Sequence, residues 1–242
     1  MREQEYAEEI ETSYSGGEII WLQAKGRKFL TLYTETEKVS SLGTAIILHP
    51  MDGHPDQKEI INPLRLFLPE HNWATLSIQL PVLGVSAKQL EYYPLFDDAN
   101  ARILAAIDHL KKGKVENIVL IGYGLGGMMA SYFLNEQGVV KDLEKADVKA
   151  IVSISLAVPD SERKQAQVLD FIKLIKQPFL DIFAENDLPE VTDSARKRRL
   201  AAKEKKAYRQ FQVAGEGHLY QHDEGLVVKR IYSWMSRGRK PE

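Results

Sequence analysis

The chain of 242 residues contains no cysteine. Disulfide bonds, thiolate nucleophiles and cysteine-ligated metals are therefore excluded, while the redox state of the compartment stays open. The chain also lacks an excess of charge of one sign, because 32 Lys and Arg residues balance 34 Asp and Glu residues and give a formal net charge of -2. Such a balance does not favour a nucleic acid or a membrane surface as the partner of the whole protein.

Long apolar runs are missing as well. No stretch has the roughly 20 consecutive apolar residues of a membrane-spanning helix, and residues 1–10 are charged and lack the apolar core of a secretion signal. The sequence therefore predicts no membrane span. The 44% hydrophobic and 27% charged residues are typical of a globular protein with a substantial core, and we expect one domain over residues 1–242.

Strand patterns alternate with helical patterns along almost the whole chain. A helix is expected over residues 2–13, and residues 18–24 and 29–34 form an antiparallel hairpin, so that residues 1–34 make an N-terminal helix and hairpin. Further strands are predicted over 44–49, 73–80, 117–121, 148–154, 179–183 and 208–213, and further helices over 60–71, 96–112, 125–137, 162–176, 192–206 and 225–237. This order predicts an α/β fold with a mostly parallel, twisted, eight-stranded sheet covered by helices on both faces.

The most informative stretch is a glycine-rich turn, Gly122 to Gly127, between the strand over 117–121 and the following helix. Strand–turn–helix units of this kind carry a nucleophile or bind a phosphate group in α/β enzymes. In a nucleophile elbow, Gly122 and Gly126 would be the small flanking residues. The nucleophile position would then be Gly124, which has no side chain that could react.

Two further residues follow later strands, where the carboxyl ends of a parallel sheet collect reactive groups. Asp187 follows the strand over 179–183, and His218 follows the strand over 208–213. The order of elbow, acid and histidine is the chain order of the catalytic triad in α/β-hydrolases. The chain resembles that superfamily over most of its length, and it is similar in particular to an uncharacterised proteobacterial family of hydrolase-like proteins grouped as a domain of unknown function.

The resemblance implies roles for several positions. Asp187 would be the triad acid, His218 the base, and Gly124 the vacant nucleophile position. An oxyanion hole would be formed by backbone N–H groups of Leu125 and of the loop over 49–53, where Met51 and Asp52 are the candidates. No large cap domain is expected.

Other residues near these loops are candidates for lining a pocket. They are His49, His54, Tyr93 and Tyr123. The carboxylate and imidazole groups around His54 are interleaved with Gly and Pro, which is more typical of turns than of metal ligation. We therefore expect neither a metal nor a cofactor.

A triad without its nucleophile predicts no acyl-enzyme chemistry. We expect a protein that binds a small molecule or a protein partner in the retained pocket. Two alternatives stay open, namely weak hydrolysis by Asp187 and His218 acting as a base, and an esterase-like hydrolase in which Gly124 replaces a native serine. The resemblance also implies a periplasmic location, because many of the related proteins carry export signals, with the cytoplasm as the alternative.

The same glycines match a second pattern. Gly122-x-Gly124-x-x-Gly127 fits the dinucleotide-binding fingerprint, which also requires an acidic residue at the end of the next strand. That strand ends Ile154-Ser155-Leu156, without a carboxylate. Dinucleotide binding therefore ranks below the hydrolase-like interpretation.

Overall fold

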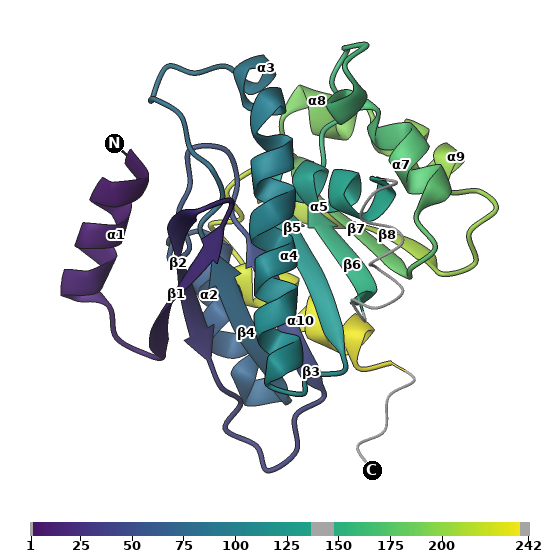
Figure 1. The fold of residues 1–242 in the computed structure, drawn as a ribbon. Coiled ribbons are helices and arrows are strands. Elements are labelled where there is room, and N and C mark those ends of the chain that lie inside the picture. Colours follow the sequence, from purple (N-terminus) through teal and green to yellow (C-terminus); the bar gives the residue numbers. More distant parts are fainter. Residues whose placement is uncertain (1, 137–147, 238–242) are drawn as a thin grey trace.

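The computed structural model describes residues 2–136 and 148–237. In this part of the chain eight strands form a single sheet with the order β1-β2-β4-β3-β5-β6-β7-β8, shown in Figure 1. β2 is antiparallel to both of its neighbours, β1 and β4, and the remaining neighbouring strands are parallel. The predicted mostly parallel, eight-stranded sheet with helices on both faces is confirmed.

The elements alternate as the sequence predicts. The strands are β1 Glu18–Ala24, β2 Arg27–Thr34, β3 Gly43–Leu48, β4 Trp73–Ile78, β5 Ile118–Tyr123, β6 Val148–Ile154, β7 Phe179–Asn186 and β8 Tyr208–Gly217. The α-helices are α1 Arg2–Ser13, α2 Ile61–Phe67, α3 Gln89–Tyr92, α4 Phe96–Lys112, α5 Leu125–Asn135, α7 Val168–Leu174, α8 Pro189–Thr192, α9 Ala195–Ala201 and α10 Glu224–Met235. Three 3₁₀ turns, η1 Pro69–His71, η2 Tyr93–Leu95 and η3 Lys164–Ala166, complete the described elements.

Three predicted helices are shorter or divided. The helix predicted over 60–71 changes to 3₁₀ geometry at Pro69, which has no backbone N–H to donate, and ends before Asn72, whose φ is 68°. The helix predicted over 192–206 is shorter: Thr192 ends α8, and only Ala195–Ala201 forms α9. Between the two helices, the Ser194 hydroxyl donates to the carbonyl groups of Glu190 and Val191. The helix predicted over 162–176 begins as η3 and continues as α7 after Gln167, which has a non-helical ψ of 49°.

Three strands are longer than predicted, at the edge where the candidate site lies. β5 continues to Tyr123, β7 to Asn186 and β8 to Gly217, instead of ending at residues 121, 183 and 213. The last residue of the helix predicted over 125–137 lies outside the described residues. The strand extensions carry the chain directly into the glycine turn and into the acid and histidine loops.

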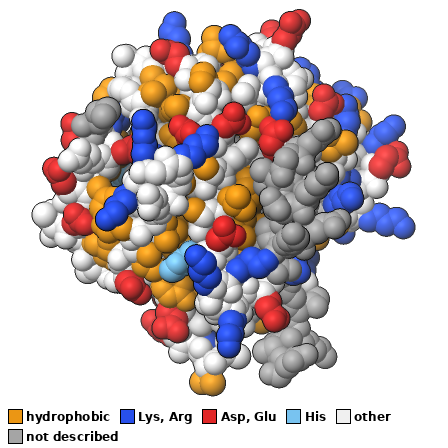
Figure 2. Space-filling model, in the orientation of Figure 1, with side chains coloured by type: hydrophobic (Ala, Val, Ile, Leu, Met, Phe, Trp, Pro, Cys, Tyr) orange, Lys and Arg blue, Asp and Glu red, His pale blue; other side chains and the backbone are white. Residues whose placement is uncertain are grey.

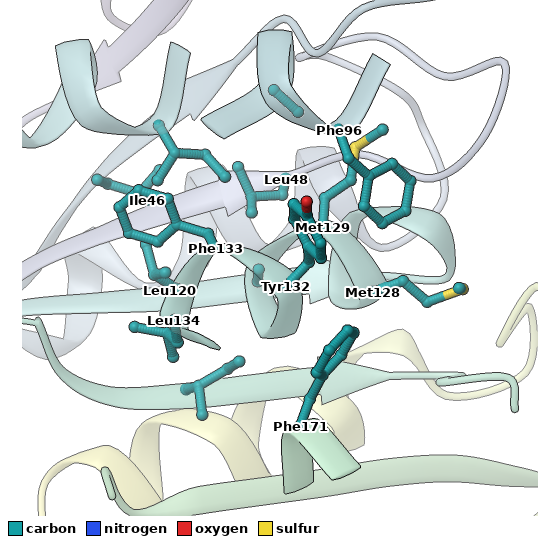
Figure 3. Close-up of a cluster of buried hydrophobic side chains, with 14 of the residues drawn as sticks. Ile46, Leu48, Phe96, Leu120, Met128, Met129, Tyr132, Phe133, Leu134 and Phe171 are labelled. Carbon is teal, nitrogen blue, oxygen red and sulfur yellow. The ribbon is translucent and has the colours of Figure 1, made fainter. Parts of the chain in front are cut away.

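Alternate residues of the central strands face opposite helix layers, as the period of a strand requires. In β3, Ile46 and Leu48 face a cluster formed with α4, α5 and α7, whereas Ala45 and Ile47 face α2 and α10. Figure 3 shows the first cluster, in which Tyr132 of α5 packs between the rings of Phe96 and Phe171. Both faces of the sheet are therefore covered by apolar side chains.

Helix α1 packs separately, beside the hairpin at one edge of the sheet (Figure 1). Its buried residues Ala7 and Ile10 contact Leu30 and Leu32 of β2. None of the helices within residues 2–136 and 148–237 combines the length and the apolar composition that a bilayer-spanning helix needs.

Candidate functional site

The glycine turn has the backbone of a nucleophile elbow. Gly124 lies between β5 and α5 with φ 53° and ψ -118°, a left-handed conformation that side-chain-bearing residues rarely adopt. The flanking glycines are required by packing, because a Cβ on Gly122 would lie 2.5 Å from backbone atoms of Gly126 and Gly127. A Cβ on Gly126 would meet the backbone of Leu48, so the turn is pressed directly against the end of β3.

Space for a side chain nevertheless exists at position 124. A Cβ placed there has Pro50 Cβ as its nearest neighbour, at 3.5 Å, which is an ordinary van der Waals distance. The left-handed backbone would cost such a residue about 1–3 kcal/mol. Gly124 therefore occupies the conformation and the space of an elbow residue but contributes no reactive atom.

The acid and the histidine are brought together. His218 Nδ1 lies 2.6 Å from Asp187 Oδ1. The side chain of Asp187 is fully buried, whereas that of His218 is 28% exposed. Because Nδ1 faces the carboxylate, Nε2 is the ring nitrogen left to contact a ligand, which is the arrangement of an acid–base pair in a triad.

The second carboxylate oxygen of Asp187 has its own set of partners. Its Oδ2 accepts a hydrogen bond from the Ser155 hydroxyl at 2.5 Å and from the Ala184 N–H at 3.1 Å. Ser155 Oγ lies in turn 2.9 Å from the hydroxyl of buried Tyr220. Burial alone would raise the pKa of Asp187, but hydrogen bonds from His218, Ser155 and the backbone outweigh it and lower that pKa.

Neither Ser155 nor Tyr220 is among the site residues predicted from the sequence. The position of Ser155 after β6, next to the strand that leads to Asp187, is the signal that could have identified it. Ser155 has a φ of 51°, so it also holds a left-handed backbone at a strand end. Its contacts assign it to the support of the acid and not to a nucleophile, because its hydroxyl is directed to Asp187.

Tyr123 supports the histidine loop. Its hydroxyl donates to the backbone carbonyl of His218 at 2.7 Å, and the two rings have their centroids 5.3 Å apart. Burial raises the pKa of the Tyr123 hydroxyl, so it is held in the protonated, donating form. This predicted pocket residue is 1% exposed and links the elbow directly to the base.

The predicted oxyanion-hole residues lie on the two segments that meet at Gly126. Among the described residues, no acceptor bonds the N–H groups of Leu125 and Met51. Leu125 opens helix α5, whose N-terminus favours negative charge. Asp52 has φ 61°, and its carboxylate accepts hydrogen bonds from Tyr92 at 2.6 Å and from Arg2 at 2.9 Å, so its side chain anchors the loop.

His49 lies beneath this loop. Its Nε2 accepts the Leu80 N–H at 2.9 Å, and its Nδ1 donates to the Pro50 carbonyl at 2.8 Å, which fixes a neutral tautomer. Burial lowers the pKa of His49 to about 3. Gln79 Nε2 lies 2.9 Å from the same Nε2 atom, so both ring nitrogens are engaged in holding the loop.

The two remaining pocket candidates are His54 and Tyr93. The His54 ring packs at 4.9 Å from that of Tyr6, and burial lowers the pKa of His54. Tyr93 is buried beside Phe96, and its hydroxyl lies 3.5 Å from Gln89 Nε2, which also contacts Met128 of α5. Within residues 2–136 and 148–237, no group of three or more acidic or histidine side chains is placed to hold a metal ion.

Comparison with known proteins places the chain in a family. The sequence pattern of the family described as "Protein of unknown function (DUF3530)" matches residues 1–91 and 96–237. The chain belongs to this family. No curated protein matches it in sequence.

Several solved structures are similar to the chain over most of its length. The chain is similar to Est1E from Butyrivibrio proteoclasticus bound to ferulic acid, with 19% identity, a TM-score of 0.70 and coverage of 90% of this chain and 98% of that one. It is also similar to a Pyrococcus furiosus esterase, with 16% identity, a TM-score of 0.72 and coverage of 91% and 92%. A third similar structure, from Xanthomonas campestris, is described as an α/β serine hydrolase without a lid, with 12% identity, a TM-score of 0.71 and coverage of 95% and 99%. The protein therefore has the α/β-hydrolase fold.

Proposed function

We propose that this protein is an α/β-hydrolase-fold protein that does not form an acyl-enzyme and that binds a small molecule or a protein partner above Gly124. The observation that supports the proposal is the geometry at position 124. The elbow keeps its left-handed backbone, and the acid–histidine pair keeps its 2.6 Å contact, but no side chain lies where a nucleophile would attack.

The chemistry that remains favours a particular kind of ligand group. The N–H groups of Leu125 and Met51 are donors at a helix N-terminus and a turn, and His218 follows β8 at the same, carboxyl-terminal edge of the sheet. Donors of this kind bind a carbonyl or anionic oxygen. The ligand would therefore present such an oxygen to the elbow and would leave without covalent exchange.

The experiment restores the missing atom. The unchanged protein, Gly124→Ser, Gly124→Ala and the double variant Gly124→Ser/His218→Ala are exposed to a fluorophosphonate probe and to p-nitrophenyl butyrate. We expect labelling of Gly124→Ser alone, with ester hydrolysis raised at least about 100-fold over the unchanged protein. Labelling of the unchanged protein would overturn the proposal, and equal labelling of the double variant would remove His218 from the role of base.

A second candidate function is favoured by the Asp187–His218 contact itself. A histidine oriented by a buried carboxylate can act as a general base on water. Slow ester hydrolysis by the unchanged protein that is lost in His218→Ala, without any fluorophosphonate labelling, would support this alternative. The same activity in both proteins would instead assign it to background hydrolysis.

A further inference from the structure

A cavity of about 650 Å³ lies between α1, the β1–β2 hairpin and α4. Its volume is within the range of roughly 300–1,000 Å³ that is typical of small-molecule sites. The lining includes the apolar side chains of Trp21, Phe29 and Leu30 and the cationic side chains of Arg27 and Lys28. Figure 2 shows hydrophobic side chains gathered over this hairpin, with Lys or Arg side chains beside them.

The apolar part of the cavity includes side-chain surface that is exposed to water. Trp21 is 43% exposed although it is a large aromatic residue, and its ring is held by a hydrogen bond from Nε1 to Glu11. Val82 adds a second apolar side chain from the segment after β4. An apolar ligand segment placed here would gain free energy by removing these groups from water.

The charged part has an excess of positive charge. Arg27 and Lys28 are exposed, and neither forms an ion pair with any described residue. An adjoining hollow of about 200 Å³ is also lined by Arg27, together with Arg102 of α4. A ligand anion would therefore meet two unpaired cations at the mouth of the cavity.

The wall between α1 and α4 contains a partly buried ion pair. Arg102 is 8% exposed, and it donates to the Gln79 carbonyl at 2.9 Å and to Glu3 Oε2 at 2.8 Å. The other oxygen of Glu3 accepts the Val82 N–H at 3.1 Å. Glu3 is thus occupied by Arg102 and Val82, so its charge does not cancel those of Arg27 and Lys28.

We infer that this cavity is a second ligand site, separate from the elbow, that binds a small amphipathic carboxylate. The apolar part of the ligand packs on the exposed surface of Trp21 and on Val82, and its carboxylate pairs with Arg27 and Lys28. The lining does not include Gly124 or His218. The inference therefore does not rest on the proposed function.

The test is a calorimetric titration with decanoate, a carboxylate with an apolar chain, and with decan-1-ol, which has the same chain without the charge. We expect decanoate to bind the unchanged protein at least about tenfold more tightly than decan-1-ol, and Arg27→Glu/Lys28→Glu to weaken decanoate binding at least about tenfold. The matched control is Arg196→Glu/Lys197→Glu, a pair of equal charge at exposed positions of α9, which should bind decanoate as the unchanged protein does.

Tryptophan fluorescence supplies an independent readout. Decanoate should shift the emission of the unchanged protein but not that of Trp21→Phe, because Trp21 is the indole in the cavity. Equal binding of decanoate and decan-1-ol, unchanged decanoate binding by a folded Arg27→Glu/Lys28→Glu variant, or no decanoate binding up to about 1 mM would overturn the inference. Should the charge-reversed variant fail to fold, the same comparison is made with Arg27→Ala/Lys28→Ala.

Discussion

Two neighbouring strand ends of this protein are followed by different residues with nearly the same positive φ. After β5, Gly124 has φ 53°, and after the adjacent β6, Ser155 has φ 51°. At Ser155 the side chain has a partner, since its hydroxyl lies 2.5 Å from Asp187 Oδ2. At Gly124 no side chain is present, although one would fit beside Pro50.

The comparison shows what maintains each conformation. A left-handed serine persists where its hydroxyl is required to satisfy a buried carboxylate. Glycine adopts the same backbone with little strain, so the shape of the elbow does not need a functional side chain to be kept. The elbow is preserved by the tight approach of Gly122 and Gly126 to neighbouring backbone atoms, independently of residue 124.

The largest expected effect is on stability, where a substitution of the flanking Gly122 should be more damaging than the same substitution of Gly124. Gly122→Ala places a Cβ 2.5 Å from the backbone of Gly126 and should lower the free energy of unfolding by about 3 kcal/mol or more. Gly124→Ala meets only Pro50 at 3.5 Å and should cost about 1–3 kcal/mol, from backbone strain alone. Urea denaturation of both variants measures the difference, and equal losses would contradict the separation of packing from backbone conformation.

The stability of the protein should fall in acid because of His49, which lies beneath the loop above the elbow. The folded-state pKa is about 3, below the ordinary value of 6.5, because the ring is fully buried. Between these values the unfolded chain binds a proton that the folded protein does not bind, so this contribution to stability is complete above pH 6.5 and is lost as the pH falls toward 3. The unchanged protein should lose up to about 1.4 kcal/mol more per pH unit in this window than His49→Gln.

Urea denaturation at a series of pH values measures these slopes. His222→Gln serves as the matched control for the loss of one imidazole, because the His222 side chain is 79% exposed. A His49→Gln slope equal to that of the unchanged protein would show that the buried ring gains its proton without unfolding.

The parts of the site that could be predicted from sequence have local signals. The spacing of Gly122, Gly124 and Gly126 after a strand marks the elbow, and the later order of Asp187 and His218 marks the acid and base positions. The predicted lengths of β5, β7 and β8 are too short, because glycine and polar residues at the strand ends are typical of loops. Pairing with the neighbouring strands, which the periodicity of the sequence does not encode, continues these strands.

Other parts depend on tertiary placement. Ser155 contacts Asp187 only because β6 lies beside β7 and because Ser155, directly after β6, has a positive φ. Tyr220 reaches the same hydroxyl from the far end of the chain. The cavity beside the hairpin exists because Glu3 of α1 bonds Arg102 of α4, a contact across 99 positions. No window of sequence contains either arrangement.

The smallest expected effect is a difference in stability between two variants of Ser155, which measures the backbone strain at the strand end after β6. Ser155→Ala and Ser155→Gly both remove the hydroxyl from Asp187, which should cost about 1–2 kcal/mol, but only Ser155→Gly also relieves the left-handed strain. Ser155→Gly should therefore be more stable than Ser155→Ala by about 1 kcal/mol in urea denaturation. If the two variants are equally stable, backbone strain at position 155 is negligible. Relief of strain alone would then not explain the glycine at position 124. The absence of a side-chain atom would be the feature that matters at the elbow.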